Sequence, residues 1–182
     1  MKLGKRDISF LLYGAFASFG TYFCMYAFRK PFTVATFEGL SFAGVDFKIV
    51  LIIAQVLGYM LSKFIGIKVI SELQPNKRIF YLLGLIFIAE ASLVLFALTP
   101  APYNLIFMFL NGIPLGMVWG IVFSYLEGRK FTEFLGVALC SSFIVSSGAV
   151  KSVGLLVLEY VGVSQFWMPS VTGAIFIVPF IF

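Results

Sequence analysis

The residues best able to do chemistry in this sequence are polar side chains set inside long apolar runs. Tyr22, Tyr26 and Arg29 are spaced at i, i+4 and i+7, which places them on one face of a helix. Tyr59 and Lys63 are one helical turn apart on a second run. A guanidinium and an ammonium group in a shared cavity would bind an anion, because Arg forms bidentate contacts and Lys acts as a point charge.

The same spacing permits a second interpretation, in which Arg29 and Lys63 only anchor their helices at the membrane surface. An ideal helix from Ile8 would bring Arg29 about 31 Å along its axis, close to the far interface. Lys63 lies four residues before the end of its apolar run at Ile67. Long basic side chains commonly extend from such positions to water. Spacing alone therefore leaves both interpretations open.

Two further ionisable residues lie inside apolar runs. Glu90 is near the middle of its run, where it is either a proton carrier for coupled transport or a structural group that pairs with a neighbour. Lys151 shares a helix face with Ser147 and lies about two turns inside the end of its run. We take Lys151 as a substrate-binding candidate and Glu90 as a coupling candidate.

The residue types that are absent exclude several kinds of chemistry. The chain has no His, which removes Ser–His nucleophilic chemistry and the usual zinc sites. It has no phosphate-binding loop of the GxxxxGK[ST] type and no carboxylates paired at catalytic spacing. Its two cysteines, Cys24 and Cys140, lie inside apolar runs. We therefore expect no enzyme activity, no cofactor, no metal and no nucleic-acid partner.

Composition predicts the elements that must position these residues. Of 182 residues, 61% are hydrophobic and 12% are charged, far from the balance of a soluble domain. A membrane span needs roughly 20 residues, so the chain accommodates about six. The prediction is an all-α membrane protein in which one bundle, residues 1–182, contains six transmembrane helices. Their expected bounds are about 8–30, 49–67, 79–99, 103–125, 134–158 and 166–182.

The two ends of the chain carry their own expectations. Cleavage of a signal peptide near residues 15–17 is possible in principle, but the apolar run continues well past that point and favours a retained helix. The sixth run is still apolar at Phe182, with no charged stop. We therefore expect a fragment cut within its sixth helix, whose partners are the lipid bilayer and a missing C-terminal half of the same chain.

Charge in the connections predicts orientation. Basic residues gather on the side of the N-terminus, which the positive-inside rule places in the cytoplasm of a multi-pass protein of the cell inner membrane. On that side they are Lys2, Lys5, Arg6, Lys68, Lys77, Arg78, Arg129 and Lys130, and on the other side Arg29, Lys30 and Lys48.

Small residues predict where helices touch. Gly112, Gly116 and Gly120 repeat every four residues on the fourth run, so that two backbones can approach closely. Ser142 and Ser146 continue a similar stride of small residues on the fifth run. We expect both helices to be docked tightly against partners.

Several motifs resemble those of a known transporter family. The stretch Tyr22-Phe-Cys-Met-Tyr-Ala-Phe-Arg-Lys-Pro-Phe32 is similar to the first-helix motif of the organophosphate:phosphate antiporters, such as the glycerol-3-phosphate transporter, within the major facilitator superfamily. Residues 58–64 are similar to their second-helix motif, residues 116–119 to the end of their fourth helix, and residues 167–169 to the start of their sixth. The stretch from Glu127 to Gly136 is also similar to a bacterial facilitator-like group of unknown function.

This resemblance implies the N-terminal six-helix half of a facilitator fold, which works by alternating access around a midplane site. It further implies that Arg29 binds phosphate in a central cavity, helped by Lys63 and by the tyrosines at positions 22, 26 and 59. The functional His of that family falls at about Val145, and neither Glu90 nor Lys151 has a counterpart there.

We therefore predict a secondary transporter of a phosphorylated or otherwise anionic small metabolite. A non-transporting sensor of a phosphorylated ligand and a proton-coupled carrier of a neutral solute are the alternatives.

Overall fold

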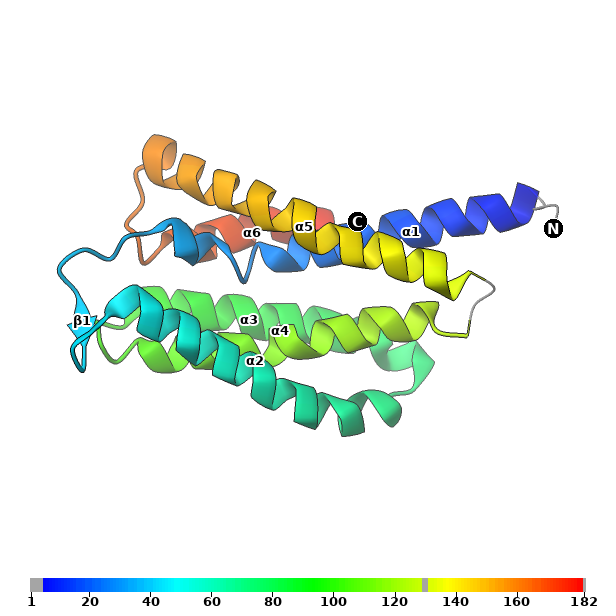
Figure 1. Ribbon diagram of the computed structural model, residues 1–182, viewed down its shortest axis with the longest axis horizontal. Coiled ribbons are helices and arrows are strands. Elements are labelled where there is room, and N and C mark those ends of the chain that lie inside the picture. Colours follow the sequence, from blue (N-terminus) through cyan, green and yellow to red (C-terminus); the bar gives the residue numbers. More distant parts are fainter. Residues whose placement is uncertain (1–4, 129–130, 182) are drawn as a thin grey trace.

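The computed structural model describes residues 5–128 and 131–181 and consists mainly of helices running back and forth along one axis (Figure 1). Five of the described helices are long and apolar enough to cross a membrane. Five long α-helices and one shorter helix follow in chain order. They are α1 (Lys5–Tyr26), α2 (Phe47–Ser71), α3 (Arg78–Leu98), α4 (Leu105–Leu126), α5 (Thr132–Leu156) and α6 (Met168–Ile181).

Short elements connect these helices. A 3-10 turn, η1 (Pro31–Val34), follows α1, and a two-stranded hairpin, β1 (Ser41–Phe42) with β2 (Val45–Asp46), leads into α2. Ala43 and Gly44 have φ of 53° and 77°, the left-handed conformation that tight hairpin turns require. A second 3-10 turn, η2 (Pro75–Lys77), precedes α3, and a π-turn, η3 (Val157–Val161), extends α5.

The first helix is shorter at its C-terminal end than the sequence predicted. The expected range was 8–30, but α1 ends at Tyr26. The backbone N–H groups of Ala27, Phe28 and Arg29 then bond three residues back, to the carbonyl oxygens of Cys24, Met25 and Tyr26. Pro31 then begins η1, because proline has no N–H to continue the α-helical ladder. Arg29 therefore lies in the turn after α1 and not on the helix itself.

The six helices form two groups of three. One group contains α1, α5 and α6, and the other contains α2, α3 and α4, as Figure 1 shows. In chain order the helices also form two sets of three, α1 to α3 and α4 to α6. The first helix of each set packs on the second helix of the other set: α1 packs on α5, and α4 packs on α2. The third helices follow the same rule, since α3 contacts α4 and α6 contacts α1. The contacts of α1, α2 and α3 thus correspond in order to those of α4, α5 and α6.

The predicted glycine stride is where α2 and α4 meet. A side chain at Gly112 would collide with the backbone of Gln55, and one at Gly116 would lie 2.8 Å from the carbonyl oxygen of Tyr59. On α5, the small residues Ser142 and Ser146 are fully buried. Both predictions of tight helix contact are confirmed.

The structure places one basic connection at the end of the bundle where α1 begins (Figure 1). The α2–α3 connection, with Lys68, Lys77 and Arg78, lies at the same end of the bundle as the start of α1 (Figure 1). Of the basic residues used to predict orientation, Lys2, Arg129 and Lys130 lie outside the described residues, as does Phe182 at the end of the sixth run.

Candidate functional site

Two positive charges meet at one tyrosine ring. The guanidinium carbon of Arg29 lies 4.2 Å from the ring centroid of Tyr59, and the ammonium nitrogen of Lys63 lies 4.8 Å from it. A cation over an aromatic face is attracted by the ring quadrupole. The turn after α1 and the middle of α2 therefore bring together the two basic residues that the sequence singled out.

Further aromatic rings complete these contacts. Arg29 also lies 5.8 Å from the ring centroid of Tyr26, and Lys63 lies 5.3 Å from that of Trp119 on α4. Arg29 is half-buried, whereas Lys63 is exposed at the surface of the bundle. Neither residue forms an ion pair with an acidic side chain in the described part of the chain.

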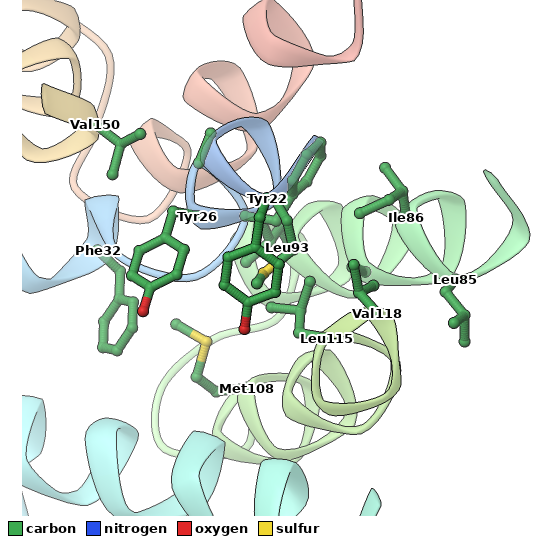
Figure 2. Packing of buried hydrophobic residues seen from close by; sticks show 14 of the residues in the cluster. Tyr22, Tyr26, Phe32, Leu85, Ile86, Leu93, Met108, Leu115, Val118 and Val150 are labelled. Atoms are coloured by element: carbon green, nitrogen blue, oxygen red, sulfur yellow. The ribbon is translucent and has the colours of Figure 1, made fainter. Parts of the chain in front are cut away.

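Tyr22 and Tyr26 are buried next to this pair. Their rings lie side by side, with centroids 5.6 Å apart, and their hydroxyls point away from α1 toward the α2–α4 group (Figure 2). The hydroxyls of Tyr22 and Tyr59 are close enough to interact. Phe143 on α5 packs against both α1 tyrosines, with its centroid 4.6 Å from that of Tyr22. All five residues predicted from helical spacing and resemblance thus form one cluster.

A series of buried hydrogen bonds links the backbone at Arg29 to α2, α3 and α4. The amide nitrogen of Gln55 donates to the carbonyl oxygen of Arg29 at 3.3 Å and to the side-chain oxygen of Asn111 at 2.8 Å. Asn111 in turn donates to the carbonyl oxygen of Ala89 on α3 at 3.1 Å. Because buried amides are costly without partners, this series fixes α2, α3, α4 and the Arg29 backbone relative to one another.

Lys151 acts on a basic residue next to Arg29. It is half-buried on α5, and its positive charge acts on Lys30. Burial first, and then the charges of Arg29 and Lys151, lower the pKa of Lys30. Gly154 on α5 packs against Pro31, and a Cβ placed on Gly154 would lie 3.1 Å from the Cβ of Pro31. This contact holds α5 against η1 and brings the two lysines together. Lys151 therefore extends the positive region on the side of Arg29 and not on that of Lys63.

A cavity adjoins Lys63 at the end of the bundle where α1 begins. It has a volume of about 470 Å³ and lies between α2 and α4, where the two helices diverge. Its charged lining residues are Lys63, Arg78 and Glu127, and Trp119 forms part of its wall. Arg78 also donates to the carbonyl oxygen of Ser124 at 2.8 Å, near the C-terminal end of α4.

Glu90 stands apart from the cluster. It faces α6, where the hydroxyl of Ser170 donates to its Oε1 at 2.7 Å. Val145, at the position of the family's functional His, is half exposed on α5. Among residues 5–128 and 131–181, no group of three or more Cys, Asp or Glu side chains is placed to hold a metal ion.

Sequence reasoning missed part of the site. Asn111 carried a usable signal, because it is an amide in the middle of an apolar run. Lys30 was counted only as a charge in a connection. Phe143 carried no signal, since a Phe in a chain with 23 of them is unremarkable until its neighbours are known.

The chain belongs to a family described as a family of unknown function, DUF5690, whose model matches residues 31–182. The matched region contains Tyr59, Lys63, Glu90 and Lys151 and begins two residues after Arg29. No curated protein and no solved structure matches the chain.

Proposed function

We propose that this six-helix bundle is one half of a facilitator-type secondary transporter, and that it binds a small anionic metabolite of the phosphorylated class. The observation that carries the proposal is the meeting of Arg29 and Lys63 over the ring of Tyr59. Cationic side chains at membrane depth are costly, and they commonly mark a substrate pathway. With no acidic partner among the described residues, these two charges would be compensated by a bound anion.

The types of the two groups support a phosphate or a related oxyanion as the ligand. Arg29 offers a planar fork for bidentate contacts, and Lys63 offers a mobile point charge. The neighbouring tyrosine hydroxyls of Tyr22, Tyr26 and Tyr59 are further hydrogen-bonding groups for oxygen atoms. Lys30, just before η1, and Lys151 on α5 extend the positive region, which favours attraction of anions over cations.

The arrangement of the helices supports alternating access. Inverted three-helix repeats are the building units of facilitator halves. The packing of α1 on α5 and of α4 on α2 fits that scheme, because each pair joins the first helix of one repeat to the second helix of the other. The cluster lies where the two repeats meet, between α1, α2, α4 and α5. The cavity beside Lys63 would give the anion a route toward the end of the bundle that holds the start of α1.

Reconstitution of the full-length protein in liposomes tests this proposal. We expect counterflow of inorganic phosphate or glycerol 3-phosphate by the parent, and weaker counterflow by Lys63→Ala. Lys68→Ala is the matched control, because Lys68 is an exposed basic residue on the same helix and lies outside the cluster. Binding without flux would instead identify a sensor, and absence of both would refute an anion site.

A further inference from the structure

Glu90 is a carboxyl group at membrane depth whose second oxygen has no hydrogen-bond partner. It lies near the middle of α3, and Ser170 donates to its Oε1 at 2.7 Å. Its Oε2 is buried and accepts no hydrogen bond in the described part of the chain. No charged side chain of the described helices faces the carboxyl group, whose polar neighbour is Ser170 on α6.

A glycine makes room for that oxygen. A Cβ built at Gly173 would collide with Oε2 of Glu90 and would lie 3.0 and 3.1 Å from ring atoms of Phe28. Oε2 and the Phe28 ring therefore lie against the same point of α6. Phe28 is fully buried and immediately precedes Arg29 in the chain.

The carboxyl group and the ring of the residue that precedes Arg29 in the chain thus lie against the same point of α6. An ionised carboxylate at this place would have one hydrogen-bond donor and no cation in contact, which is costly in an apolar environment. Its negative charge would also oppose an anion held by Arg29, because charges interact over longer distances where water is excluded. A protonated Glu90 removes both penalties.

We infer that Glu90 is a proton-binding site coupled to the anion site at Arg29, so that a proton and the anion are bound and carried together. This inference rests on the proposed transport function. If anion binding favours protonation of Glu90, protonation must favour anion binding by the same factor. Coupling of this kind would let a proton gradient drive accumulation of the anion.

Binding of inorganic phosphate to the full-length protein at about pH 5.5 and about pH 8.5 tests the coupling. Glu90→Gln keeps the acceptor for Ser170 and cannot ionise. We expect the parent and Glu90→Gln to bind equally at the lower pH, and the parent to bind roughly fivefold or more weakly than Glu90→Gln at the higher pH. Titration of phosphate itself affects both proteins alike and cancels in this ratio.

Glu159→Gln is the matched control, because Glu159 is an exposed carboxylate in η3, the turn after α5. It should follow the parent at both pH values. An affinity ratio between the parent and Glu90→Gln that is the same at both pH values would overturn the inference and leave the anion site intact. Failure of the parent to bind phosphate at either pH would overturn the proposed function, and this inference with it.

A measurement on the unmutated protein covers the case in which Glu90→Gln does not fold. Hydrophobic carbodiimides modify protonated carboxyl groups in membranes, and mass spectrometry locates the adduct. We expect modification of Glu90 to decline as the pH rises, and bound phosphate to move that decline to higher pH. Modification that is unaffected by saturating phosphate would contradict the coupling.

Discussion

The guanidinium of Arg29 lies 4.2 Å from the ring centroid of Tyr59, although the two residues belong to segments separated by the hairpin and half of α2. The contact turns Arg29 toward Lys63, which lies against the same ring. A shared site requires such convergence, whereas anchoring at the membrane surface does not.

The first prediction concerns the shape of the Arg29 group. Arg29→Lys keeps the charge but loses the planar fork that stacks on the ring and contacts an oxyanion twice. We expect phosphate binding to weaken by about 1–3 kcal/mol, the worth of a charge-assisted hydrogen bond. Equilibrium binding to the full-length protein measures this, and unchanged affinity would show that Arg29 only anchors its segment.

The second prediction concerns the coupling between Arg29 and Lys63. Because both groups contact one ring and would share one ligand, the losses in binding free energy of Arg29→Lys and Lys63→Ala should not add in the double variant. A double-mutant cycle on phosphate affinity measures the difference. Pairing Arg29→Lys with the distant Lys48→Ala should give additive losses, and additivity in both cycles would separate the two residues functionally.

The third prediction tests the contact of α2 with α4. Gly112→Ala places a Cβ against the backbone of Gln55, which cannot move aside as a flexible side chain would. We expect a loss in stability of about 1–3 kcal/mol, the usual cost of overpacking, and a lower melting temperature in detergent.

Gly84→Ala is the control for that substitution. Gly84 is on α3, and a Cβ there meets no atom within 4 Å. Stability should be unchanged or slightly higher, because Ala is the better helix former. If Gly112→Ala melts at the same temperature as Gly84→Ala, α2 and α4 are not in backbone contact.

The fourth prediction uses the shifted pKa of Lys30. The charge of Lys151 contributes to lowering that pKa, so Lys151→Gln should raise it toward its ordinary value. Only the neutral amine reacts with acylating reagents, and the pH at which Lys30 is half-reactive should therefore move upward. Lys48→Gln, a basic residue that does not act on Lys30, should leave the half-reactive pH unchanged. No shift in Lys151→Gln would place Lys151 away from η1.

The fifth prediction concerns orientation in the membrane. Asn76 and Ser41 are exposed in connections at opposite ends of the bundle. With the exposed Cys140 replaced by Ser, a cysteine at Asn76 should react with an impermeant thiol reagent only from the cytoplasmic side, and one at Ser41 only from outside. The reverse pattern would invert the topology.

The sequence by itself was sufficient to predict a helical protein with membrane-spanning apolar helices, five of the six expected spans, and the faces on which Tyr22 and Tyr59 lie. These features are local: the length of an apolar run decides whether it can span a membrane, and helical period decides which side chains share a face. The stride of Gly112 and Gly116 also predicted a close contact correctly, because only small residues let two backbones approach.

The partner in each contact was decided only by the tertiary structure. The glycine stride does not say that α4 meets α2, and nothing near Glu90 in the sequence indicates Ser170, which is 80 positions away. Lys151 acts on Lys30 because Gly154 packs on Pro31 and holds α5 against η1. The helix α1 ends at Tyr26, where the next N–H groups bond three residues back, and Pro31 prevents the α-helix from resuming. Which helices pair depends on many weak contacts summed over their whole lengths, and that sum exists only once every helix is in place.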